Sequence, residues 1–134
     1  MSNNEIKKYF DLHTTGIGYL NRVREVTPKE GNPFLSVTIA ALRGSVDNVQ
    51  YTHFECRVSG RQAQQVVRQV KPAVEGKLKV LIGFTLSDLY AETFTFKNGD
   101  KAGETGISLK ARLLRVSWAK VDGQPFYKEQ ERAA

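Results

Sequence analysis

The sequence predicts an all-β domain: a five-stranded barrel with one helix between the third and fourth strands and a long hairpin between the fourth and fifth. Three observations predict it. Apolar and polar residues alternate through most of the chain, which is the period of strands with one buried face. Only residues 61–74 have helical spacing instead. The length of 134 residues is that of one domain, with its core at about residues 15–120.

The first two strands are separated by a turn. Residues 15–26 have a strand pattern that contains Gly16 and Gly18, and glycine inside a strand often marks a bend or a bulge. Residues 27–33 are rich in turn formers. The second strand covers residues 34–43, and its apolar face consists of Leu35, Val37, Ile39 and Ala41. Its more polar face consists of Phe34, Ser36, Thr38 and Ala40.

The third strand covers residues 51–59 and also has two distinct faces. Its apolar face consists of Phe54, Cys56 and Val58. Its other face consists of Tyr51, His53, Glu55 and Arg57. Because one face of every strand fills the interior of a closed barrel, we expect the second set to point outward.

The helix follows over residues 61–74. Its apolar stripe consists of Ala63, Val66, Val67, Val70 and Val74. We expect this stripe to close one end of the barrel, and we expect Pro72 and Gly76 to end the helix.

Two more strands and a long hairpin are predicted in the last part of the chain. The fourth strand covers residues 77–85, with Leu78, Val80 and Ile82 together on one face. Residues 86–106 form the hairpin, which turns at Asn98-Gly99. The fifth strand covers residues 107–113 and continues through Trp118 to a turn at Asp122-Gly123, whereas the polar residues 128–134 are expected to fray.

This order of elements is typical of the oligonucleotide-binding fold, or OB-fold. An open α+β sheet covered by one helix is the alternative. The net charge of +6 favours a polyanionic partner, either nucleic acid or an acidic membrane. Cys56 is the only cysteine, so no disulfide can form within the chain. The chain starts without an apolar signal segment and its apolar runs are too short to cross a bilayer, so we expect a cytoplasmic protein with no membrane partner.

The outward faces and the hairpin combine aromatic rings with cations. An exposed ring contributes about 1–3 kcal/mol for each base that stacks on it, whatever the base. Lysine and arginine between the rings would neutralise phosphates. The candidate nucleic-acid-binding residues are therefore Tyr19, Arg22, Arg24, Phe34, Tyr51, His53, Arg57, Lys77, Lys79, Tyr90, Phe94, Phe96, Lys97, Lys101, Lys110 and Arg112.

Each part of this set has a second interpretation. The aromatic residues either stack on bases, cap the barrel or pack in a subunit interface. The hairpin with Phe94 and Phe96 either closes over a bound strand, folds back on the barrel or pairs with another subunit. The cations of the fourth and fifth strands either extend the binding path or form a solvated face. Trp118 either closes the core or adds a stacking platform.

Catalysis has little support in the sequence, and we expect a protein that is not an enzyme. His13, His53 and Cys56 are too few and too scattered for a zinc site, and Cys56 faces inward. The glycines at 98–103 follow a hairpin strand rather than a strand-to-helix turn, so they do not form a phosphate-binding loop. We therefore expect no metal and no cofactor.

Four short stretches, residues 18–25, 32–40, 53–61 and 76–80, resemble the bacterial single-stranded DNA-binding protein family in the same order along the chain. Residues 31–44 most resemble the small replication-associated proteins of integrative conjugative elements. The resemblance covers roughly residues 15–118. His53 stands where that family has a stacking tryptophan, which is a departure from the pattern.

The resemblance implies sequence-tolerant binding of single-stranded DNA during replication or transfer of mobile DNA, and a homo-oligomer, either a tetramer or a dimer. That family often ends in an acidic tip that recruits enzymes. Residues 129–134 do not resemble it, so we do not expect such recruitment. Two alternatives remain open, namely an RNA-binding barrel and a protein-interaction module on the same fold.

Overall fold

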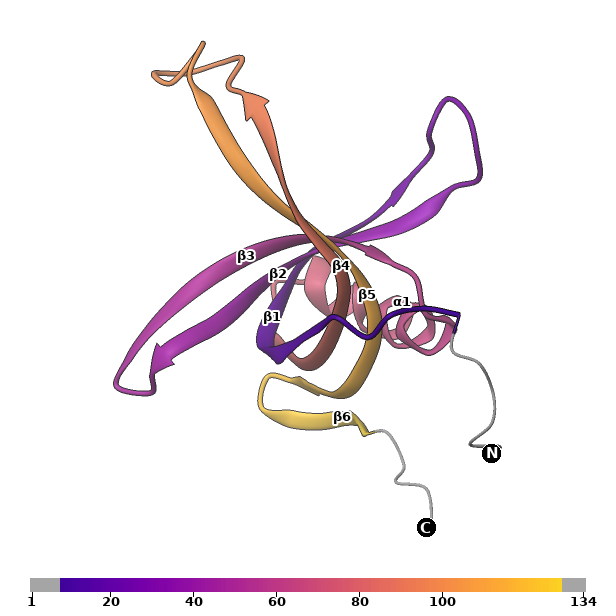
Figure 1. Cartoon of the computed structure of the whole chain (residues 1–134). Coiled ribbons are helices and arrows are strands. Elements are labelled where there is room, and N and C mark those ends of the chain that lie inside the picture. The colour runs from indigo at the N-terminus through magenta and orange to yellow at the C-terminus, as the bar shows by residue number, and fades with distance from the viewer. Residues whose placement is uncertain (1–7, 129–134) are drawn as a thin grey trace.

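The computed structural model describes residues 8–128, and strands dominate it (Figure 1). The elements follow one another as β1 (His13–Val26), β2 (Phe34–Ser45), β3 (Asn48–Val58), α1 (Arg61–Glu75), β4 (Val80–Thr95), β5 (Thr105–Val121) and β6 (Gln124–Lys128). The predicted order of five strands with a helix between the third and fourth is confirmed. The short strand β6 was not predicted, and the expected fraying concerns residues that, apart from Lys128, lie outside the described part of the chain.

The strands close into a barrel in the order β1-β2-β3-β5-β4. β1 pairs antiparallel with both β2 and β4, β2 with β3, and β4 with β5. The parallel pairing of β3 with β5 closes the ring. A closed five-stranded barrel with its helix between β3 and β4 is an OB-like fold, so the open α+β sheet is excluded.

The barrel interior is filled by the faces that alternation assigned to it. On β2 and β3 the predicted inward residues are all buried, and together with the buried residues of β4 and β5 they form one core. Ser36, Thr38 and Ala40 of the opposite face of β2 are also nearly inaccessible to solvent. The Thr38 hydroxyl donates a hydrogen bond to Glu55 Oε2 at 2.8 Å, so its burial leaves no unpaired polar group.

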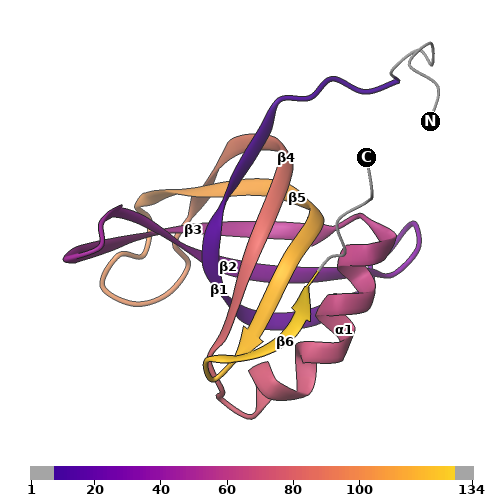
Figure 2. The ribbon, with the colours of Figure 1, turned by 90° about the horizontal axis from the view of Figure 1, so that it is seen from below.

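The helix α1 joins this core through its valine stripe. Val66, Val67 and Val70 are buried, and α1 lies against β1, β4 and β5 (Figure 2). Gln62 fixes its start: Nε2 donates hydrogen bonds to the Val116 carbonyl at 2.6 Å and to the Tyr127 hydroxyl at 2.7 Å. The helix therefore holds both β5 and β6.

The end of α1 differs from the prediction. Pro72 lies inside the last turn, where its missing N–H costs only one helical hydrogen bond, so the expectation that Pro72 ends the helix is wrong. The Lys77 N–H donates to the Val74 carbonyl at 3.1 Å, and the Leu78 N–H donates to the Ala73 carbonyl at 3.0 Å. These two bonds form a Schellman motif, in which Lys77 has the left-handed φ angle of 67°.

The same turn moves the start of β4. Because residues up to 78 complete the helix end, the strand begins at Val80 instead of Lys77. Leu78 is consequently 44% exposed, and its predicted place beside Val80 and Ile82 on the inner face is wrong.

Glycine has a different role in β1 from the expected bend. A Cβ atom on Gly18 would lie 2.8 Å from the Ala40 carbonyl oxygen, so this glycine permits close approach of β2. The irregularity in β1 lies further along, between Asn21 and Arg24, where the register to β2 shifts. This bulge changes which side chains share the outer face.

The predicted excursion over residues 86–106 consists mostly of strand. β4 continues to Thr95 and β5 begins at Thr105, and this ribbon projects from the barrel (orange in Figure 1). Among the described residues, no helix combines the length and the apolar character needed to cross a membrane.

Candidate nucleic-acid interface

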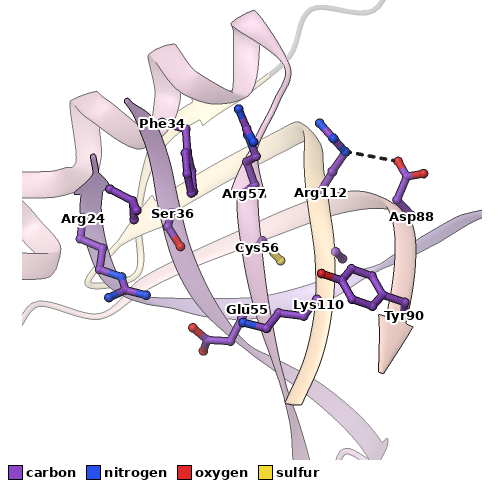
Figure 3. Close-up of a pocket in the computed structure, with 12 residues that line it drawn as sticks. Arg24, Phe34, Ser36, Glu55, Cys56, Arg57, Asp88, Tyr90, Lys110 and Arg112 are labelled. Carbon is purple, nitrogen blue, oxygen red and sulfur yellow. Dashed lines mark ion pairs between the residues drawn. The ribbon is translucent and has the colours of Figure 1, made fainter. Parts of the chain in front are cut away.

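The outer face of the barrel carries its charged side chains in transverse rows, because residues opposite each other on paired strands share a face. One row crosses all five barrel strands and consists of Arg24, Ser36, Arg57, Arg112 and Ser87. We call Arg24, Arg57 and Arg112 the arginine row. The three residues occupy equivalent positions on β1, β3 and β5, and the Arg57 and Arg112 side chains extend the same way, whereas the Arg24 side chain extends away from them (Figure 3).

This row crosses a cavity of about 350 Å³, the arginine groove, to which Phe34, Glu55, Tyr90 and Lys110 also contribute (Figure 3). The groove is flanked by the β1–β2 connection, which ends at Phe34, and by the base of the β4–β5 hairpin. The Arg57 guanidinium lies over the Phe34 ring, 4.3 Å from its centroid. This contact holds the ring in a fixed place beside the cations.

The charges of the arginine groove do not balance. Four cations line it, against the two carboxylates of Glu55 and Asp88. Arg112 Nε lies 3.7 Å from Asp88 Oδ2, and Lys110 Nζ lies 4.0 Å from Oε2 of Glu92, which is outside the groove lining. Within residues 8–128, Arg24 and Arg57 have no acidic partner within ion-pair distance. The surplus positive charge is suited to an anionic ligand.

Cys56 also lines the arginine groove, although it is only 1% exposed. Burial, together with the smaller effect of the neighbouring Glu55 carboxylate, raises the pKa of its thiol from 9.0 to about 12. The thiol is therefore neutral near pH 7 and a poor nucleophile. Its predicted inward orientation is confirmed.

A second and larger cavity of about 620 Å³ lies beyond the other end of the β3 outer face. We call it the tyrosine groove, and its polar lining consists of Tyr19, Asn21, Arg22, Tyr51, His53, Lys77 and Lys79. Three of these are cations, and no carboxylate of residues 8–128 lines the groove. Its walls come from β1, from β3 and from the connection between α1 and β4. A smaller cavity of about 310 Å³ adjoins it through Tyr19 and Lys79.

Arg22 joins this groove because of the bulge in β1. Simple alternation would place residues 19 and 22 on opposite faces. The shifted register after Asn21 and the left-handed backbone of Arg22, with φ at 41°, place its side chain with Tyr19. The sequence analysis also placed Tyr19 and Arg22 on one surface, but it did not predict the bulge that brings them together.

The hairpin tip carries a third group of candidate residues. The rings of Phe94 and Phe96 meet edge to face with centroids 4.9 Å apart, and Lys101 Nζ lies 5.7 Å from the Phe96 centroid. Both rings lie against Gly106, where a Cβ atom would be 2.6 Å from Phe94. The two phenylalanines line neither groove, and they contact each other rather than the barrel core.

The structure thus divides the predicted site residues into three groups. Tyr51 and Arg57 both face outward from β3, as predicted, but they are six positions apart, which is about 20 Å along a strand. On this shared outer face they line two different grooves. The path expected from Lys77 and Lys79 to Lys110 and Arg112 is likewise split between the two grooves.

Three residues near the grooves were missing from the predicted set. Arg68 of α1 lines a cavity of about 220 Å³ beside Phe34 and pairs with Glu25 at 2.8 Å. Asp88 enters the arginine groove at a bulge of β4. Lys120 lines the smaller cavity, and its Nζ lies 5.7 Å from the Trp118 ring. Of these three residues, only Lys120 could have been predicted from the sequence, because strand alternation places it on the same face as Trp118.

Trp118 lies on the outer face of β5, outside the buried core. Its ring covers Gly83 of β4, where a Cβ atom would lie 2.5 Å from the indole nitrogen. The expectation that it closes the core is therefore wrong. A role in stacking remains a prediction.

Comparisons with known proteins place this chain by family alone. No curated protein and no solved structure gives a significant match. One family model, described as a protein of unknown function, matches residues 3–134. Because this match covers almost the whole sequence, the chain belongs to the DUF3577 family.

Proposed function

We propose that this protein binds single-stranded DNA, without strong sequence preference and without catalysis, at the arginine groove. One observation carries the proposal: the row of Arg24, Arg57 and Arg112 crosses the outer face beside the fixed Phe34 ring. This face, between the β1–β2 connection and the β4–β5 hairpin, is the one OB-folds use for oligonucleotides.

Charge and stacking would act together in this groove. Phosphates lying along the arginine row would displace counterions, which makes the affinity strongly dependent on salt. Arg57 covers one face of Phe34, and Tyr90 on the opposite wall is 56% exposed. Tyr90 and the remaining surface of Phe34 are the rings on which bases would stack. Because all bases have a flat face, such binding tolerates any sequence.

The choice of DNA, and a place in the replication or transfer of mobile DNA, rest on the resemblance of residues 15–118 to single-stranded DNA-binding proteins. The same resemblance supports a homo-oligomer. RNA offers the same phosphates and bases, so an equal-sequence competition between DNA and RNA oligonucleotides separates the two ligands. Sedimentation of the free protein tests the oligomer.

The test of the groove is a titration of fluorescently labelled oligothymidylate followed by anisotropy. The double variant Arg24→Ala/Arg57→Ala removes two cations that have no acidic partner in residues 8–128. The control Arg61→Ala/Lys71→Ala removes the same charge from α1, and neither residue lines a groove. We expect a large loss of affinity in the first variant and little in the second. An equal loss of affinity in both variants would contradict the proposal. Failure of the wild-type protein to bind the oligonucleotide would contradict it as well.

A further inference from the structure

The tyrosine groove has features that the arginine groove does not explain. Two of its three cations stand at positions where the backbone conformation favours glycine. Arg22 and Lys77 have φ angles of 41° and 67°, a region that costs a residue with a side chain about 1–2 kcal/mol relative to glycine. Both side chains line this one groove.

Lys77 is the clearer case because it occupies a defined position. The Schellman motif at the end of α1 places its left-handed residue at Lys77, the position where glycine is usual. Gly76 precedes it with φ at −80°, which any residue can adopt. The chain thus has its glycine one residue early and a lysine where the glycine belongs. Backbone strain of this kind collects at functional sites.

The groove is also strongly positive and rich in rings. Arg22, Lys77 and Lys79 line it without any carboxylate, and within the described residues none of their side chains forms an ion pair. Tyr51, which is 47% exposed, and Tyr19 supply flat faces. Cations beside rings are the combination that recognises a phosphate attached to a base.

The outer face of β3 connects the two grooves. Tyr51 and His53 line the tyrosine groove, whereas Arg57 lines the arginine groove. Glu55, which lines the arginine groove on the side toward His53, lies between them on the same face and accepts a hydrogen bond from Thr38. A single carboxylate between two positive cavities repels phosphate locally, so the ligand would be gripped at two places rather than evenly along β3.

We propose that the tyrosine groove is a second binding site for the same nucleic-acid strand, occupied only when the strand is long enough to leave the arginine groove and pass Glu55. This inference rests on the proposed function. Two linked contacts raise affinity through effective concentration, because the second contact forms within a complex that already exists. Affinity should therefore rise in a step with length.

The step can be measured with two oligothymidylates of about 4 and about 16 nucleotides, the ends of the range that one OB-fold covers. The variant Lys77→Gly/Lys79→Ala removes two cations from the tyrosine groove. Glycine at position 77 suits the left-handed backbone, and the Lys79 main chain keeps its bonds to Asp122, so the fold is retained. Thermal melting checks this, and Lys77→Gly alone should melt no lower than the wild type.

We expect the variant to bind the short oligonucleotide like the wild type and to bind the long one with a salt slope smaller by about 1.4, the effect of two lost phosphate contacts on a single strand. The control Arg61→Ala/Lys71→Ala should leave the difference between lengths unchanged. Equal weakening for both lengths, or no change for the long one, would overturn the second site. If the wild type binds neither length, the proposed function itself fails, which is a distinguishable outcome.

Discussion

Backbone strain at four single residues marks the cavities of this surface. The residues other than glycine with a positive φ angle, within the described chain, are Arg22, Lys77, Asp88 and Asp122. Each of them lines one of the cavities on the barrel surface. Asp88 and Asp122 tolerate this conformation better than most residues, since a short polar side chain can bond locally. Arg22 and Lys77 have no such compensation, which is why their charge needs a functional explanation.

A substitution of Asp88 tests whether the net charge of the arginine groove determines its affinity for oligonucleotides. Its carboxylate pairs with Arg112 at 3.7 Å and partly neutralises the arginine groove. We expect Asp88→Asn to strengthen oligonucleotide binding by about two- to fivefold, the size of a surface charge interaction. Asparagine also tolerates the left-handed backbone, so stability should hold. Asp47→Asn, on the β2–β3 turn, is the matched control, and weaker binding by Asp88→Asn would contradict this account of the groove.

The buried Cys56 thiol gives a pH dependence whose sign is fixed. Its pKa is about 12 in the folded protein, against an ordinary value of 9.0. The folded state therefore holds the proton more tightly, and the stability it provides is complete below pH 9 and decreases as the pH rises toward 12. Between these values the unfolding free energy of the wild type should fall faster than that of Cys56→Ala. Parallel pH profiles in chemical denaturation would show that the thiol is not buried.

At the level of elements, the local sequence pattern predicted each helix or strand that buries one continuous apolar face. The valine stripe predicted α1, and alternation predicted the buried faces of β2 and β3. The local pattern failed where contacts with other elements determine whether a strand forms or where it begins. β6 was missed because its five residues are held by β5 and by the Gln62 bond to Tyr127, which have no local signal. The start of β4 was misplaced because the helix end extends to Leu78.

The β4–β5 hairpin is the element whose role is most open to direct test. Its Phe94 and Phe96 rings contact each other near the tip and not the barrel core. Phe94→Ala/Phe96→Ala should therefore leave thermal stability nearly unchanged. If the rings stack on bases, the variant loses about 1–3 kcal/mol of binding free energy per base. Ile107→Ala, an exposed apolar change on the same hairpin, is the control. Unchanged affinity alongside altered sedimentation would assign the rings to a subunit interface.

For the whole molecule, the division of the site into two grooves was beyond sequence reasoning. Alternation places Tyr51 and Arg57 on one face of β3, which is correct. Their neighbours across the sheet depend on the register of β3 with β5, a parallel pairing between strands far apart in the chain. That register brings Arg112 beside Arg57. The pattern within each strand fixes which residues face outward, but it does not fix which outward residues of the two strands lie opposite each other.

The measurement that tests the central claim most directly is the salt dependence of binding to labelled single-stranded DNA, with a duplex of the same sequence as competitor. Phosphate neutralisation by the arginine row predicts a straight line of log K against log salt, with a slope of about −0.7 for each phosphate contacted. It also predicts that single strands compete far better than duplex, because only unpaired bases can stack on Phe34 and Tyr90. Affinity that ignores salt, or that is equal for duplex and single strand, would contradict the claim.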